Sequence, residues 1–147
     1  MSSIRNTPAY MPQHSPNSPL HLASWAAYLA DCKKCGDITV LKTQGITSIA
    51  DYFVIASGQS RSQVRATVEE IETLFGDAGF PARSDERDQQ NTWCLLDYGD
   101  IVVHVMQEDQ REFYRLEQFW NHAEPLPREQ WLSIAHDELG LQPFGTP

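Results

Sequence analysis

Residues 52–75 constrain the fold more than any other segment, because an apolar stretch leads directly into a strongly marked helix. Residues 52–56 are apolar throughout, as in a central strand covered on both faces. Ser60 and Gln63 then form a capping-box pattern, in which each side chain can satisfy the other's exposed amide. One apolar stripe follows at helical spacing, made of Val64, Val68, Ile71 and Phe75. The segment predicts a buried strand followed by an amphipathic helix.

The remaining segments predict further strands and helices around this pair. A first helix is expected from Ser18 as N-cap, with Pro19 at its first position and Gly36 ending it. Strands are expected at 38–42, 82–85, 93–97 and 101–106, and a polar, solvated loop at 85–91. The fold class is therefore α/β in the broad sense (α+β, mixed), a single domain with a mixed sheet of about five strands flanked by helices.

The two ends of the chain differ in character from the middle. Residues 1–18 are rich in Ser, Asn, Gln and Pro and are expected to be disordered. A third helix is predicted from Asp109, with an inner face of Phe113, Leu116 and Trp120. Prolines at 125 and 127 are expected to break the chain before a short terminal helix over 128–139.

The charge balance narrows the choice of partners. The net charge is −9, and residues 61–100 hold four Arg against nine acidic residues. Such a field repels phosphate backbones, so extensive nucleic-acid contact is disfavoured and a basic protein surface is favoured. No apolar run approaches the ~20 residues of a membrane helix. With three cysteines and no secretion-signal pattern, the expectation is a cytoplasmic protein in a reducing compartment.

Cys32 and Cys35 form a C-x-x-C pattern, which is typical of zinc or redox sites. A structural zinc site needs four ligands, and the chain has one further thiol, Cys94. A redox pair normally sits at a helix N-terminus, whereas this pair falls at a predicted C-terminus. The favoured interpretation is two structural cysteines, with no metal and no cofactor.

A second candidate site is nucleotidyl transfer. Ser57-Gly58-Gln59-Ser60 leads from a strand into a helix N-terminus, a geometry that can hold phosphate. Two metal-binding acids would be expected one residue apart on a nearby strand, but Asp97 and Asp100 are three apart and flank a turn. Both, like Asp51, are therefore interpreted as turn or interface residues. An enzyme using Ser60 with Asp97 and Asp100 remains the alternative.

His104 lies within an apolar strand, and no nucleophile with a supporting acid is identifiable around it. A hydrogen-bonded structural role is favoured over that of a general base. Arg111 and Tyr114 lie three residues apart on one side of the third predicted helix, where a solvated face is an equal alternative.

Taken in order, five segments resemble the ribosomal silencing factor family, also called the Iojap family. They read DITVL (37–41), GITSIADYFVIASG (45–58), SRSQV (60–64), WCLLDYGDIVVHVM (93–106) and REFYRLEQFW (111–120). The resemblance covers about residues 20–122. It implies three parts: a disordered extension at 1–18, the silencing-factor domain at 19–122, and a C-terminal extension with a short helix at 123–147.

The resemblance also implies a fold and an activity. The sheet of this family is similar to that of nucleotidyltransferases but lacks the catalytic acids. Its members bind ribosomal protein L-fourteen of the large subunit, block joining of the two subunits and lower translation when nutrients are scarce. Neither catalysis nor a cofactor nor a membrane is implied. Self-association of the free protein into a homodimer is left open.

The family's binding surface, carried over by position, gives a set of expected partner-binding residues. They lie on the strand-turn-strand element and the last helix, and they are Trp93, Leu95, Asp97, Tyr98, Gly99, Asp100, His104, Arg111 and Tyr114. Trp93 and Tyr98 are the expected aromatic anchors. Strand alternation places Trp93, Leu95 and Asp97 on one face, with Cys94 and Leu96 on the other.

Overall fold

The computed structural model describes residues 10–114 and 122–142 of the 147-residue chain. Its helices are α1 (Pro19–Cys32), α2 (Arg61–Asp77), α3 (Glu108–Tyr114) and α5 (Arg128–Ser133), which continues into the π-helix η2 (Ile134–Glu138). Its strands are β1 (Gly36–Lys42), β2 (Tyr52–Gly58), β3 (Ser84–Arg87), β4 (Trp93–Asp97), β5 (Ile101–Gln107) and β6 (Glu124–Leu126). The predicted mixed α+β domain is confirmed.

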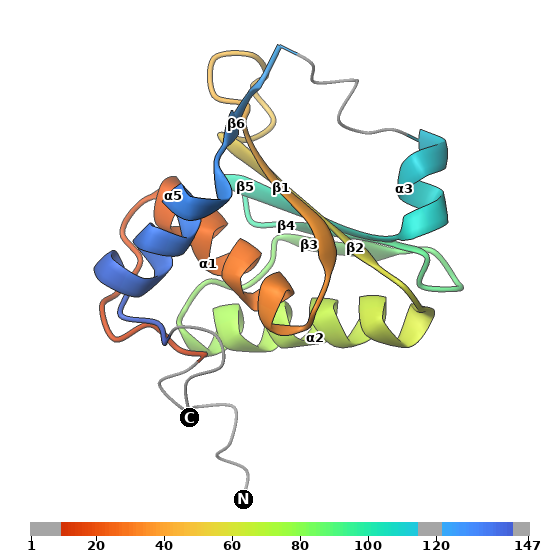
Figure 1. The fold of residues 1–147 in the computed structure, drawn as a ribbon, viewed down its shortest axis with the longest axis horizontal. Helices are drawn as coiled ribbons and strands as arrows, with labels where there is room; N and C mark the ends of the chain where they lie inside the picture. The colour runs from red at the N-terminus through yellow and green to blue at the C-terminus, as the bar shows by residue number, and fades with distance from the viewer. Residues whose placement is uncertain (1–9, 115–121, 143–147) are drawn as a thin grey trace, which may run out of the picture.

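The described strands form one mixed sheet in the order β3-β4-β5-β2-β1-β6 (Figure 1). Strands β2 and β5 are parallel, and the other neighbours are antiparallel. Strand β2 lies inside the sheet, as its apolar run predicts. The N-terminal ends of β2 and β5 lie side by side, with Tyr52 paired to Ile101. Their C-terminal ends also lie side by side, with Gly58 paired to Gln107.

Two edge strands differ from the sequence-based expectation. Strand β6 forms where Pro125 and Pro127 were expected only to break the chain, and Leu126 pairs with Val40 of β1. Proline is tolerated there because an edge strand needs only half of its amides for pairing. Strand β3 lies two residues later than expected and uses part of the segment interpreted as a solvated loop. Its charged side chains suit an edge that faces solvent.

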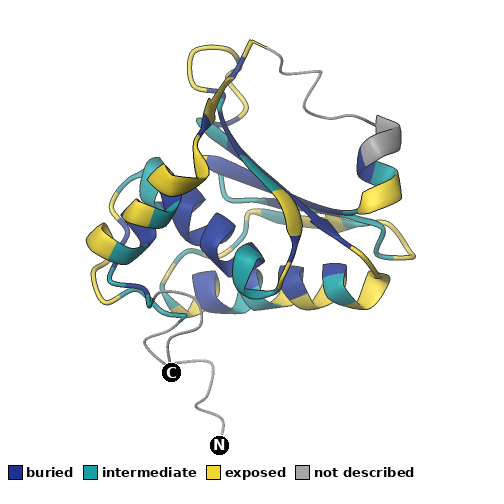
Figure 2. Cartoon of the chain, in the orientation of Figure 1, coloured by how far each residue is buried: buried dark blue, intermediate teal, exposed yellow. Residues whose placement is uncertain are grey.

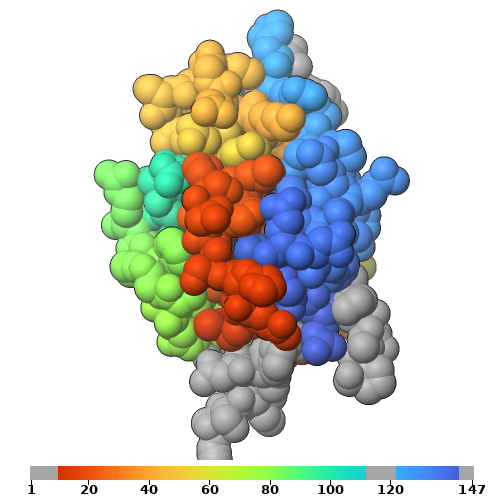
Figure 3. Space-filling model, turned by 90° about the vertical axis from the view of Figure 1, so that its left-hand side faces the viewer, coloured from red at the N-terminus to blue at the C-terminus, as the bar shows by residue number. Residues whose placement is uncertain are grey.

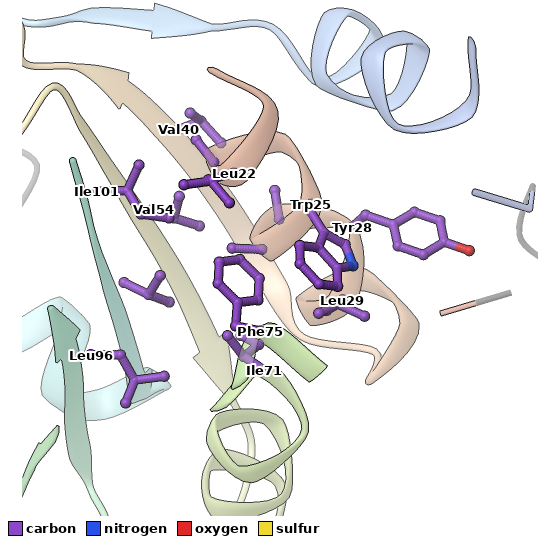
Figure 4. Close-up of a cluster of buried hydrophobic side chains, with 14 of the residues drawn as sticks. Leu22, Trp25, Tyr28, Leu29, Val40, Val54, Ile71, Phe75, Leu96 and Ile101 are labelled. Atoms are coloured by element: carbon purple, nitrogen blue, oxygen red, sulfur yellow. The ribbon is translucent and has the colours of Figure 1, made fainter. Parts of the chain in front are cut away.

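Helices α1 and α2 lie against one face of the sheet, with α5 beside α1, whereas α3 lies on the other face (Figure 1). Leu22, Trp25 and Leu29 of α1 converge with Ile71 and Phe75 of α2 on the strands (Figure 4). The rings of Trp25 and Phe75 stack with centroids 4.3 Å apart. The outer sides of α2 and α5 are exposed (Figure 2). This face of the sheet is therefore the hydrophobic core.

The predicted starts of α1 and α2 are confirmed by their caps. The Ser18 hydroxyl accepts a hydrogen bond from the His21 amide at 3.1 Å, and the Ser60 hydroxyl accepts one from the Gln63 amide at 3.1 Å. The far end of α1 differs, because the helix ends at Cys32 rather than at Gly36. Lys34, not a glycine, takes the left-handed backbone conformation there, with φ of 65°.

The two ends of the described chain pack on each other and on α1. The indole nitrogen of Trp25 donates to the carbonyl of Tyr10 at 3.0 Å, and the Gln13 amide donates to the carbonyl of Leu139 at 2.8 Å. Figure 3 shows these N-terminal and C-terminal segments side by side. Residues 10–18 are therefore ordered, which corrects the expectation of disorder for that part; residues 1–9 lie outside the described residues.

The terminal helix is part of the core. Trp131, Ile134 and Ala135 are buried, as predicted, and Gly140 ends the segment with φ of 75°. The predicted inner face of the third helix, Phe113, Leu116 and Trp120, lies outside the described side chains. Within the described residues, no helix is long and apolar enough to cross a membrane.

Candidate functional site

The second face of the sheet carries most of the predicted partner-binding residues. Trp93, Leu95 and Asp97 are half-buried and share this face, whereas Cys94 and Leu96 point into the core. The strand register places Leu95 of β4 opposite His104 of β5 and Asp97 opposite Val102. The predicted alternation along β4 is confirmed, and it brings an indole, an apolar chain and a carboxylate together at the β3–β4 side of the sheet.

His104 holds the Trp93 indole in place. The indole nitrogen donates to Nδ1 of His104 at 3.2 Å, so the histidine proton is on Nε2. The Phe53 ring lies against the imidazole at a centroid distance of 5.4 Å. His104 is only 6% exposed, and this burial lowers its pKa to about 4. The histidine is therefore a neutral structural residue, the role that the sequence favoured.

The turn between β4 and β5 is built from three of the predicted residues. The Asp97 carboxylate accepts a hydrogen bond from the Gly99 amide at 2.8 Å, and Gly99 has φ of 88°. Asp100 is exposed, and its carbonyl accepts a hydrogen bond from the Asp51 amide at 2.8 Å. The interpretation of Asp97 and Asp100 as turn residues is confirmed for their backbone geometry, and the Asp100 side chain remains available to a partner.

Tyr98, expected to be an aromatic anchor together with Trp93, lies on the opposite side of the sheet from it. Its ring packs against Phe75 of α2, with centroids 4.7 Å apart, on the core side of the sheet. Burial, together with the charges of Glu72 and Asp85, raises the pKa of Tyr98. The structure therefore does not bring Tyr98 together with Trp93 as a second aromatic anchor.

Arg111 is buried beneath α3 rather than displayed. Its guanidinium donates to the hydroxyls of Ser57 and Thr39, each at 2.9 Å, and to the carbonyl of Asp37. These bonds hold α3 to β1 and β2, so the buried Arg111 side chain fixes α3 on the second face of the sheet. Tyr114 is the last described residue of α3, and its side chain lies outside the described part of the chain.

Glu86 and Asp88 complete the acidic side of this face and were not predicted. Glu86 of β3 pairs with Leu95, and the Asp88 carboxylate accepts hydrogen bonds from the amides of Thr92 at 2.7 Å and Trp93 at 3.1 Å. A groove of about 360 Å³ runs here, lined by Glu86, Arg87, Asp88, Trp93 and Leu95. The alternate spacing of Glu86 and Asp88 places both on one face of an extended segment, but which face depends on the register between β3 and β4.

The geometry contradicts the alternative enzyme site. Ser60 follows the C-terminal end of β2, whereas Asp97 and Asp100 flank the N-terminal end of β5. Because β2 and β5 are parallel, these residues lie at opposite ends of strands about 20 Å long. A phosphate at Ser60 could not also contact a metal ion held by Asp97 and Asp100.

The cysteines have separate surroundings. The Cys35 thiol lies 3.3 Å from the Thr67 hydroxyl, while Cys32 interacts with the Tyr28 hydroxyl. Burial raises the pKa of Cys32 and of Cys94 to about 11. Across the described residues, no three His, Cys, Asp or Glu side chains gather in a group that could hold a metal ion.

The fold and this face define a class of protein, a small α+β domain whose exposed functional groups lie on a sheet face. A family model described as "ribosomal silencing factor during starvation" matches residues 14–140. A ribosomal silencing factor of Bacillus subtilis is 40% identical over 98 residues, 67% of this chain and 83% of that protein. One of Halalkalibacterium halodurans is 36% identical over 112 residues, 76% of this chain and 96% of that protein.

The solved structures agree with this relationship. A crystal structure of a Chromobacterium violaceum protein superposes with a TM-score of 0.69 at 30% identity, covering 71% of this chain and 88% of that one. The chain therefore belongs to the ribosomal silencing factor family. The family match includes residues 123–140, which the sequence resemblance had left outside the domain.

Proposed function

We propose that this protein acts in the cytoplasm by binding ribosomal protein L-fourteen on the large subunit, at the surface that meets the small subunit. Bound there, it prevents the subunits from joining and represses translation when nutrients are scarce. The action is steric and involves no catalysis, so it needs only affinity, position and bulk.

The observation that supports this proposal best is the chemistry of the face around Trp93. A half-buried indole and a leucine lie among the carboxylates of Glu86, Asp88 and Asp97. An aromatic anchor with acidic residues around it complements a basic protein surface. The net charge of −9 favours such a partner over bare RNA on the ribosome.

The predicted residues other than Tyr98 and Tyr114 take three roles in this proposal. Trp93, Leu95, Asp97 and Asp100 contact the partner. His104 and Arg111 are positioning residues, because the first holds the indole and the second holds α3 to the sheet. Gly99 shapes the turn that presents Asp100.

Co-sedimentation with isolated large subunits tests the proposal. The protein is expected to sediment with large subunits, to be absent from small subunits, and to be excluded when the two subunits are joined beforehand. Equal sedimentation with joined ribosomes would contradict a position at the subunit interface. Failure to sediment with large subunits would contradict binding itself.

A further inference from the structure

We infer that the groove between β3 and β4 receives an arginine side chain of the partner protein. The inference rests on the proposed function, because it names what the partner presents to the face around Trp93. The groove has an apolar wall of Trp93 and Leu95 and an acidic wall of Glu86 and Asp88. At about 360 Å³, it has room for one long side chain.

The negative charge of the groove is held in place and is not neutralised by its own neighbours. Asp88 is fixed by hydrogen bonds from the Thr92 hydroxyl and from the Thr92 and Trp93 amides. Burial alone would raise its pKa, but these hydrogen bonds outweigh burial and lower it. Glu86 is exposed and makes no ion pair within the described residues. The Asp88 carboxylate is thus held in its charged form at neutral pH.

Arg87 also lines the groove, but its charge is satisfied on the far side of β3. Its guanidinium lies 2.9 Å from Asp85 and 3.1 Å from Glu72, with Glu69 at 3.8 Å. The side chain alternation of β3 places Arg87 opposite Cys94, on the core side, and Glu86 opposite Leu95. The groove therefore keeps a net negative charge although an arginine belongs to its lining.

Arginine fits this combination better than lysine. A planar guanidinium can stack on the indole of Trp93 while its fork donates to Glu86, and its aliphatic stem can lie on Leu95. A lysine ammonium is more strongly hydrated and cannot stack. The Trp93–His104 hydrogen bond fixes the indole before the partner arrives, so little side-chain entropy is lost on binding.

The first test compares large-subunit affinity across matched variants. Glu86→Gln is expected to weaken binding about tenfold and Glu86→Arg about 100-fold or more. Glu129→Gln removes the same charge from exposed α5 and is expected to change affinity less than twofold. If Trp93→Ala loses binding while both Glu86 variants keep wild-type affinity, the arginine groove is wrong and the proposed function stands. If wild-type protein does not bind large subunits, the proposed function fails.

The second test needs no ribosome. N-acetyl-arginine amide is titrated against the isotope-labelled protein, and the indole resonance of Trp93, assigned by its loss in Trp93→Phe, is followed. The arginine derivative is expected to shift this resonance in wild type at millimolar concentration and to have at most a tenth of that effect in Glu86→Gln. A shift of equal size with N-acetyl-lysine amide, or none with either compound, would overturn the inference.

Discussion

The indole nitrogen of Trp93 donates to Nδ1 of His104 at 3.2 Å, which ties β4 to β5 across the second face of the sheet. This bond requires a neutral histidine with its proton on Nε2. Protonation of Nδ1 would place a second donor against the indole N–H. The pair therefore links the charge state of a buried residue to the orientation of the tryptophan on the proposed binding face.

The pH dependence of stability follows from this pair. The pKa of His104 is about 4 in the folded protein and about 6.5 when unfolded. Between these values the unfolded chain binds a proton that the folded protein excludes, so stability falls as the pH falls from 6.5 to 4. Between pH 7 and pH 4, this difference in pKa lowers the free energy of unfolding by about 3 kcal/mol. The free energy of unfolding is measured with urea for wild type and His104→Gln from pH 7 to pH 4. It should fall less with pH in the variant. An equal fall in both proteins would contradict this role of His104.

Tyr98 is expected to matter for stability rather than for binding. Its ring packs on Phe75, while its buried hydroxyl has no hydrogen-bond partner within the described part of the chain. Tyr98→Phe should therefore raise the free energy of unfolding by up to about 1 kcal/mol. Tyr98→Ala should lower it by about 2–3 kcal/mol. Urea unfolding measures the free energy of unfolding of both variants. An equal loss in both would show that the Tyr98 hydroxyl stabilises the fold.

The C-terminal helix is expected to be indispensable for folding. Trp131 is 1% exposed and packs into the core formed by α1. Trp131→Ala should cost about 3–5 kcal/mol of unfolding free energy, whereas the exposed neighbour change Glu129→Ala should cost less than about 0.5 kcal/mol. Thermal and urea unfolding of both variants provide the comparison. A Trp131→Ala protein as stable as wild type would mean that packing of the C-terminal helix contributes little to the stability of the domain.

The three thiols are expected to be slow to react. A pKa of about 11 for Cys32 and Cys94 leaves about 100-fold less thiolate at pH 8 than in an ordinary cysteine. Burial also raises the pKa of Cys35. Alkylation by iodoacetamide, followed by mass spectrometry, should be about 100-fold slower in native protein than in urea. A thiol that is alkylated as fast in native protein as in urea would contradict the raised pKa of that cysteine.

Much of the fold could be predicted from sequence because its strongest signals are local. The caps at Ser18 and Ser60 and the apolar run at the start of β2 each act within a few residues. Strand β6 could not be predicted in this way. It has three residues, and its pairing partner β1 lies some eighty residues earlier in the chain, so only the tertiary fold makes it a strand.

The site could be predicted where strand alternation decides it, and not elsewhere. Alternation along β4 placed Trp93, Leu95 and Asp97 on one face. The direction of Tyr98 depends on the turn at Gly99, where alternation stops. The contribution of Glu86 depends on the register between β3 and β4, which no pattern within β3 itself reveals.

Subunit joining on sucrose gradients is the most direct test of the proposed docking face. Large and small subunits are mixed with increasing amounts of wild-type protein or of Trp93→Ala that has been shown to fold. Wild type is expected to shift joined ribosomes to free subunits. The variant should require about 30-fold more protein, which corresponds to about 2 kcal/mol at an interface hot spot. A folded Trp93→Ala protein that blocks joining at the wild-type concentration would contradict the docking face.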